Sequence, residues 1–256
     1  MFFVMQNFNQ MNHINKSFAQ YFKPSLKFAF FIIILLSARS LLYEPFIIPS
    51  GSMKDTLLVG DYIFVSKYSY GYSRFSFPFS PDVVSAKPRL FYNQPQRGDV
   101  VVFKGTKDTK NYIKRVIGLP GDTVQIKVGV VYVNENQILR TKDHKSKNDD
   151  YVTYTEQPLK NTCYKVLQQD LLSYVNNTDL YNVPQGHFFV MGDNREHSTD
   201  SRFLSSIGFV PAENLIGKAQ RVLISFGPSK IKFNFLPIRL ERIWKDIKPS
   251  DCSKIN

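Results

Sequence analysis

The sequence contains little cysteine: only Cys163 and Cys252 occur among its 256 residues, and they lie far apart. No Cys-x-x-Cys pair is present, which argues against a structural zinc site and against a thioredoxin-like centre. We therefore expect no metal and no cofactor. The two cysteines either form a disulfide in an oxidising compartment or remain free thiols, and the sequence leaves both possibilities open.

A dense block of lysine and arginine is also absent, although the net charge is +12. A basic protein of this kind contacts nucleic acid, contacts anionic lipid headgroups, or simply has a solvated basic surface. Because no such block and no RNA-binding aromatic motif occur, nucleic acid is not an expected partner.

Helical patterns are scarce beyond residue 45, whereas strand patterns are frequent, and the 22 phenylalanines and 14 tyrosines favour strands. Alternating or β-branched runs predict strands at "YIFVSKYSY", Asp99–Phe103, "YIKRVIGL", "TVQIKV", "VVYVN", "NQILR", His187–Met191 and Gly217–Phe226. We therefore predict a mostly β fold, built as an antiparallel meander of short strands.

Changes of composition divide this β region. Residues 73–96 hold four prolines and predict a long irregular loop, residues 141–160 are polar, and residues 164–181 mix strand and helix signals. We therefore predict two core blocks, 43–135 and 186–245, with an inserted and less regular subdomain, 136–185, between them. Residues 246–256 are predicted to be a C-terminal tail.

One uncharged run, "FAFFIIILLSA", extends from Phe28 to Ala38. Extended to residues 26–42 it gives about 25 Å of helix, which spans the hydrocarbon core if Lys27 and Arg39 reach the interfaces. A cleaved signal peptide would end in an Ala-x-Ala-like site, and a core helix would be apolar on one side only; neither pattern is present. We therefore predict a retained transmembrane anchor at 26–42.

The flanks of the anchor predict its orientation. Residues 1–25 contain Lys16 and Lys23, Lys27 follows at the start of the run, and no acidic residue occurs among them. The positive-inside rule then makes 1–25 a cytoplasmic tail and places the remainder outside. Because that remainder is basic, anionic phospholipid would attract it.

Ser50-Gly51-Ser52 follows the anchor closely and suggests chemistry. Gly51 lets the backbone approach a ligand, and the Ser50 hydroxyl can donate to a developing oxyanion beside a backbone N–H. With a base at hand, Ser52 would perform acyl transfer on a peptide carbonyl. The alternative is an ordinary turn.

The base is either a histidine or a lysine. Of the four histidines, only His197 lies in a richly polar segment, "GDNREHSTDSR". Lys114 lies in the apolar "YIKRVIGL" beside Arg115, where burial would lower its pKa by up to about three to five units. Alternation puts the two basic residues on opposite faces, so one of them has an unusual partner or the strand is an edge.

Four segments, taken in order, resemble the motifs of bacterial type I signal peptidases (leader peptidases): "PSGSMKDTLLVGD", "RGDVVVF", "YIKRVIGLPGD" and "GDNREHSTDSR…GFVP". They cover roughly residues 45–135 and 186–226. The resemblance implies a Ser-Lys endopeptidase of the bacterial inner membrane, with an extracytoplasmic (periplasmic) β catalytic domain. Its expected substrates are secretory preproteins, whose signal peptides it removes by cutting after small residues.

The resemblance also implies residue roles. Ser52 would be the nucleophile and Lys114 the general base, with Ser50 and the Ser52 N–H as the oxyanion hole. Ser198 would orient Lys114. Residues expected to hold the site together are Asp193, Asp200 and Arg202, and those expected to line the substrate groove are Ile48, Pro49, Met53, Tyr112 and Ile113.

The sequence departs from the family pattern at Asp55, where the family commonly has proline, so that we expect a less stiff loop there. A second membrane span and a closely spaced cysteine pair, found in some members, are absent. A Ser52–His197 pair stays open as an alternative. A self-cleaving DNA-binding repressor would need a helix-turn-helix before the serine, and a non-enzymatic anchored β protein would not need Ser52.

Overall fold

The structure is a computed structural model that describes residues 27–35, 41–77, 89–143, 151–169, 173–227 and 237–252. The chain divides into two units, Met1–Leu41 and Leu42–Asn256. In the first unit, residues 27–35 are helical. Among the described residues, no helix is both long enough and apolar enough to cross a bilayer. The predicted tail, 1–25, and part of the predicted anchor, including residues 36–40, lie outside the described residues.

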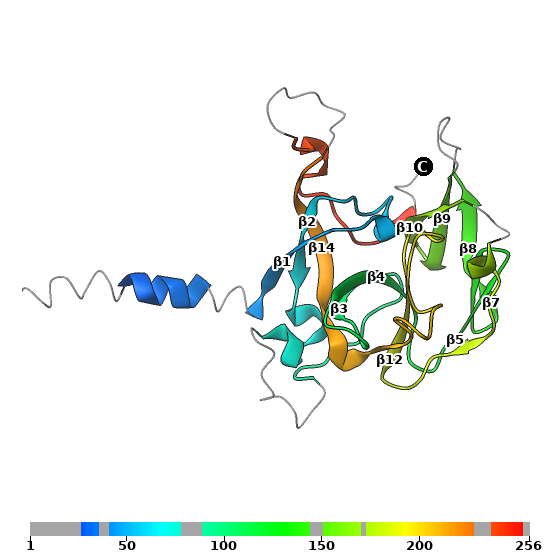
Figure 1. Ribbon diagram of the computed structural model, residues 1–256, viewed down its shortest axis with the longest axis horizontal. Coiled ribbons are helices and arrows are strands. Elements are labelled where there is room, and N and C mark those ends of the chain that lie inside the picture. The colour runs from blue at the N-terminus through cyan, green and yellow to red at the C-terminus, as the bar shows by residue number, and fades with distance from the viewer. Residues whose placement is uncertain are drawn as a thin grey trace, which may run out of the picture. The chain divides into compact units, whose positions relative to one another are not determined.

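The second unit is built on a seven-stranded sheet, whose strands β1, β2, β14, β3, β4 and β12 are labelled in Figure 1. Every neighbouring pair in it is antiparallel. Its strands, in sheet order, are β1 (Tyr43–Ile47), β2 (Asp61–Ser66), β14 (Leu215–Ser225), β3 (Val100–Lys104), β4 (Asn111–Gly118), β12 (His187–Met191) and β13 (Val210–Pro211). The strand that carries Lys114, β4, is therefore internal.

Two smaller antiparallel sheets lie on the side of β4 and β12 that is away from β1 (Figure 1). One has the order β11 (Tyr181–Asn182), β5 (Thr123–Lys127), β6 (Val130–Val133) and β7 (Asn136–Gln137). The other has the order β10 (Thr162–Gln168), β9 (Val152–Leu159) and β8 (Leu139–Lys142).

The strand β3 explains how the main sheet is stabilised. Val100 and Val102 belong to one buried cluster, and Val101 and Phe103 belong to another. Because successive side chains point to opposite faces of a sheet, one strand supplies both clusters. A continuous apolar run is the expected sequence for a strand buried on both faces.

The predicted mostly β, antiparallel architecture is confirmed for the described part of the chain. The insertion at 136–185 is more regular than we expected, because it contains the β8–β9–β10 sheet. Most residues of β9 are only half buried, and strands exposed to this degree carry polar sequences that resemble loops. Its first strand, β7, pairs with β6 and so continues the preceding hairpin. Residues 144–150 lie outside the described residues.

The segment 237–252 packs against β14 along part of its length. Val222 N donates to Lys245 O at 2.9 Å, Trp244 N donates to Val222 O at 2.8 Å, and Ile247 is only 2% exposed. Cys252 is joined to Cys163 of β10 by a disulfide, which decides the question that the sequence left open. Residues 246–252 of the predicted tail are therefore fixed to the domain, and residues 253–256 lie outside the described residues.

We expect reduction of this disulfide to destabilise the domain, because it closes a loop across an 89-residue separation. The free energy of unfolding should fall by about 2–4 kcal/mol when urea unfolding is measured with a reductant. In a Cys163→Ala/Cys252→Ala variant the reductant should change nothing. Equal unfolding midpoints for the oxidised and reduced protein would contradict a stabilising bond.

Candidate active site

Ser52 lies in a single 3-10 turn, η1 (Gly51–Met53), a few residues after edge strand β1. The Ser52 residue is 9% exposed. A Cβ added at Gly51 would contact no atom within 4 Å, so the backbone before the serine faces open space. A substrate backbone can therefore approach this turn closely.

Lys114 lies beside this serine. Its Nζ atom is 2.5 Å from Ser52 Oγ, although 62 residues separate the two in sequence. Both basic residues of "YIKRVIGL" are buried, Lys114 at 3% and Arg115 at 1% exposure, and β4 has neighbours on both sides. Of the two alternatives left open by the sequence, the edge strand is therefore excluded, and each basic residue has a specific partner.

The environment of Lys114 favours its uncharged form. Burial lowers the pKa of Lys114 from 10.5 to about 8, although Asp200 and Asp193 act in the opposite direction. Among the described residues, Ser52 is the one hydrogen-bond partner of the amine, and no carboxylate forms an ion pair with it. An amine without an ion-pair partner is suited to accept a proton.

Arg115 is paired with Asp193 in a buried, two-pronged contact. Its Nε donates to Asp193 Oδ1 at 2.7 Å and its Nη2 to Oδ2 at 2.6 Å. Thr56, four residues after Ser52, donates to the same carboxylate at 2.6 Å. Asp193 thus links β4 to the loop that follows the serine. Planar pairs of this kind are strong and fix orientation.

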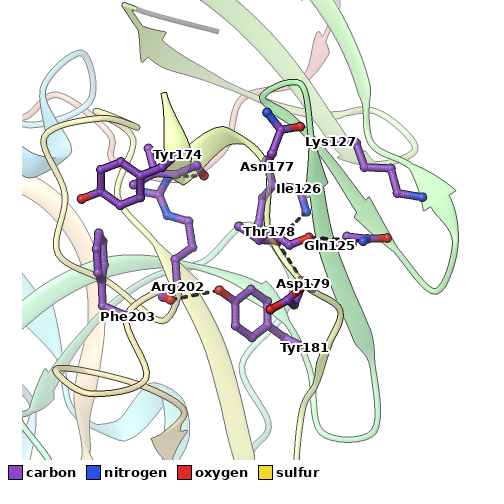
Figure 2. Close-up of a pocket in the computed structure, with 11 residues that line it drawn as sticks. Gln125, Ile126, Lys127, Tyr174, Asn177, Thr178, Asp179, Tyr181, Arg202 and Phe203 are labelled. Carbon is purple, nitrogen blue, oxygen red and sulfur yellow. Dashed lines mark hydrogen bonds between the residues drawn. The ribbon is translucent and has the colours of Figure 1, made fainter. Parts of the chain in front are cut away.

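Asp200 and Arg202 form a second buried pair, with distances of 2.8 Å from Nε to Oδ1 and from Nη2 to Oδ2. Burial alone would raise the pKa of Asp200, but the charge and hydrogen bonds of Arg202 hold it below its ordinary value. Figure 2 shows Arg202 in the wall of a pocket of about 520 Å³, where Tyr181 Oη donates to its backbone carbonyl at 2.9 Å. Asp200 and Arg202, both expected to hold the site together, are thus in direct contact, and their role in the site stays a prediction.

Ser198 and Gly192 pack tightly near the nucleophile. A Cβ added at Gly192 would lie 2.2 Å from Ser198 Oγ and 2.5 Å from the carbonyl oxygen of Ser52, so only glycine fits there. The buried Ser198 hydroxyl has no hydrogen-bond partner among the described residues. Its predicted role, to orient Lys114, therefore stays a prediction.

Asn194 is one residue of this site that we did not predict. Its Nδ2 donates to Gly51 O and its backbone N to Ser52 O, each at 3.1 Å. These two bonds hold the turn that carries the nucleophile. The signal for this role in the sequence was weak, because Gly-Asp-Asn is already accounted for by an ordinary turn.

The insertion reaches the same loop through Glu156, which we also did not predict. Glu156 on β9 forms a buried two-pronged pair with Arg195. In addition, Arg195 N donates to Leu167 O at 3.0 Å, and Leu167 N donates to Asp193 O at 2.8 Å. The sheet of the insertion therefore supports the loop at 192–202.

The predicted groove residues fall into two groups. Ile48 and Met53 are 2% and 0% exposed and belong to a core cluster, against which the half-buried Ile113 packs. Pro49 is exposed, and Tyr112 is half buried with its hydroxyl on Asp108 at 2.8 Å. Contact between these residues and a substrate stays a prediction.

His197 is exposed, and its Nε2 lies 3.3 Å from Gln169 Oε1, whereas the partner of Ser52 is Lys114. The geometry therefore favours the lysine as base. Among the described residues, no group of three or more His, Cys, Asp or Glu side chains is arranged to hold a metal ion.

Comparison with known proteins identifies the family. Residues 22–224 match the family model described as "Signal peptidase, peptidase S26". The chain is 38% identical to "Signal peptidase I" of Rickettsia akari (strain Hartford), over 96% of this chain and 100% of that protein. This chain belongs to the signal peptidase I family. The resemblance seen in the sequence is thereby confirmed, and with it the expected activity of a serine peptidase that removes signal peptides.

Further relatives carry the same name. "Signal peptidase I" of Rickettsia prowazekii (strain Madrid E) is 44% identical over 77% of this chain and 78% of that protein. A crystal structure of a signal peptidase I from Enterococcus faecalis V583 is 28% identical and covers 49% of this chain and 97% of that one. Its TM-score is 0.33, too low to compare the folds.

We expect Asp193→Asn to destabilise the domain strongly, because Arg115 would keep its buried charge without a counter-charge. The loss in free energy of unfolding should be about 3–5 kcal/mol. A matched control is Asp246→Asn, whose ion pair with Arg221 has side chains 56% and 49% exposed. That change should cost about 0–1 kcal/mol. Equal losses in urea unfolding would show that the Asp193 pair has no special importance.

Proposed function

We propose that this chain cleaves signal peptides with Ser52 as the nucleophile and the neutral amine of Lys114 as the general base. The observation that carries the proposal is the 2.5 Å contact between Lys114 Nζ and Ser52 Oγ, with Lys114 buried. Because a lysine must lose its proton before it can act as a base, the lowered pKa of Lys114 supports the same assignment.

The proposed reaction has two halves. Lys114 takes the hydroxyl proton of Ser52 while Oγ attacks the scissile carbonyl, and the Ser50 hydroxyl and the Ser52 N–H donate to the oxyanion. Lys114 then returns the proton to the leaving amine, which departs from an acyl-enzyme. Water, deprotonated by Lys114, attacks the ester carbonyl, the bond from that carbon to Ser52 Oγ breaks, and Lys114 returns the proton to Oγ as the signal peptide leaves. Asp193, Asp200, Arg202 and Ser198 position this machinery.

Among the described strands, β1 has a neighbour on one side only, which supports a substrate that binds as an added strand. β1 is the first strand of the sheet, and it leads within a few residues to Ser52. An extended segment paired along this edge would receive backbone hydrogen bonds and present alternate side chains to pockets. Of the predicted groove residues, Pro49 is exposed and Tyr112 and Ile113 are half buried. We propose that small pockets there select small residues before the cut.

Changes at the two central residues test this mechanism directly. Ser52→Ala should fold but leave a synthetic preprotein uncut. Lys114→Arg and Lys114→Met should each lose about 10²–10⁴-fold in rate, since neither side chain can act as a base at neutral pH. His197→Ala should retain most activity. An inactive His197→Ala together with an active Lys114→Met would make the histidine the base.

The pH dependence follows from the same residue. Cleavage should rise with pH along a limb with its midpoint near 8, the pKa of Lys114 in the folded protein. Below that pH the folded protein must hold Lys114 as a buried cation. The free energy of unfolding of the wild-type protein, relative to that of Lys114→Met, is therefore lowest there. The deficit disappears as the pH rises from about 8 towards the ordinary value of 10.5. If variants at Lys114 still cleave, with the same rise of rate with pH, Lys114 is not the general base.

We further propose that residues 26–42 anchor the chain in the bacterial inner membrane, with residues 1–25 in the cytoplasm and the catalytic domain, in its two blocks 43–135 and 186–245, on the periplasmic side. The unit Leu42–Asn256, which we call the catalytic unit, carries aromatic side chains, three exposed and one half buried, that support contact with phospholipid. Tyr68, Tyr43, Phe64 and Trp244 form a row of ring contacts with centroids 5.6–5.9 Å apart. We call these four residues the aromatic row. Such rings are suited to the headgroup level of a bilayer.

The topology is tested by adding protease to intact spheroplasts. We expect digestion of the region after residue 43 and survival of a short membrane-embedded fragment. A cytoplasmic protein in the same cells serves as the control for intact membranes. Protection of the catalytic unit under these conditions would reverse the proposed orientation.

A further inference from the structure

A pocket of about 350 Å³ lies beside the loop that follows Ser52, and neither Ser52 nor Lys114 lines it. We call it the Lys245 pocket. Its volume lies in the range of small-ligand sites. The charged and hydroxyl-bearing side chains of its lining that matter here are Asp55, Arg115, Tyr164, Lys165, Lys245 and Lys248.

Several charges in the lining already have partners. Arg115 is paired with Asp193, Lys165 with Asp143 at 2.8 Å, and the lining residue Asp246 with Arg221 at 2.9 Å. No ion pair or side-chain hydrogen bond is found for Lys245 or Lys248 within the described ranges. The pocket therefore contains two ammonium groups without direct counter-charges.

Lys245 and Lys248 are exposed, so their ammonium groups can reach a ligand in the pocket. Tyr164 is only 4% exposed and its hydroxyl is fully buried, so it cannot donate to such a ligand. Partial burial lowers the pKa of Lys245, with Arg242 acting in the same direction, so an anion near this amine would relieve both effects.

We propose that the Lys245 pocket binds a phosphate group, with the ammonium groups of Lys245 and Lys248 as donors. Charge-assisted hydrogen bonds from several donors are the usual means of holding such an oxyanion. Asp55 is the one unpaired carboxyl in the lining, and it opposes an anion. Replacement of Asp55 by a neutral residue therefore distinguishes the two kinds of site: it strengthens binding at an anion site and weakens binding at a cation site.

The phosphate has two possible sources. Trp244 directly precedes Lys245 and belongs to the aromatic row, so a phospholipid headgroup would present its phosphate at the level of these rings. Free inorganic phosphate offers the same oxyanion. The headgroup source rests on the proposed membrane contact, whereas the binding of phosphate itself does not.

Trp244, the only tryptophan in the sequence, reports on the neighbouring pocket by its fluorescence. We would titrate the full chain, as Ser52→Ala in a neutral detergent, with inorganic phosphate at constant ionic strength set by chloride. We expect a saturable change. Lys245→Met should raise the Kd about tenfold or more, because a charge-assisted bond is lost. Asp55→Asn should lower the Kd.

Lys127→Met is the matched control, since Lys127 lines the pocket of Figure 2 and not the Lys245 pocket; its Kd should stay unchanged. If Lys245→Met unfolds at a lower urea concentration, Lys248→Met replaces it. No saturation, equal Kd values for the lysine variants and the control, or weaker binding by Asp55→Asn would each overturn the proposal.

Vesicles distinguish the two sources. A Trp244 shift on phosphatidylglycerol vesicles that Lys245→Met loses, and that inorganic phosphate competes away, supports the proposal with a headgroup as ligand. Binding of inorganic phosphate with an unchanged vesicle response in Lys245→Met supports it with free phosphate as ligand. Because Ser52→Ala serves throughout, failure of phosphate binding leaves the cleavage mechanism untouched, and failure of the mechanism leaves the pocket untouched.

Discussion

The burial of two adjacent basic residues on one internal strand is the constraint that shapes this molecule. Arg115 cannot lose its proton, so the fold supplies Asp193 directly against it. Lys114 can lose its proton, and the fold places a serine hydroxyl, not a carboxylate, against its amine. Arg202, close enough to depress the pKa of Lys114, is itself balanced by Asp200. The arginines thus stay charged while the lysine is left free to be neutral.

This arrangement draws support from distant parts of the chain, because η1 is a single 3-10 turn of three residues. Asn194 holds the carbonyls of Gly51 and Ser52, and the loop of Asn194 is held by Glu156 of the insertion through Arg195. The same insertion is tied to the C-terminal segment by the disulfide. The insertion and the C-terminal segment are therefore structural supports for the site as well as additions to the domain.

Much of this could be predicted from local patterns, and the rest could not. The apolar run at β3 and the alternation in "YIKRVIGL" predict strands, because strand periodicity is a local property. Periodicity could not decide whether Lys114 faces water or Ser52, since that depends on a partner 62 residues away. Only the ordered motifs suggested the pair. The disulfide and the Glu156–Arg195 pair depend on tertiary distances, which spacing in a sequence does not contain.

Asp55 shows how a departure from a family pattern is accommodated. Its φ is 90°, a left-handed backbone conformation that proline, fixed near −65°, cannot adopt. Aspartate tolerates that region better than most residues. The loop is also held by Leu57 N on Met53 O at 2.8 Å and by Thr56 on Asp193 at 2.6 Å. We expected a less stiff loop without the proline; these bonds, together with the full burial of Leu57, restrain it by tertiary contacts instead. Stiffness beside the nucleophile can thus come from the fold as well as from the residue type.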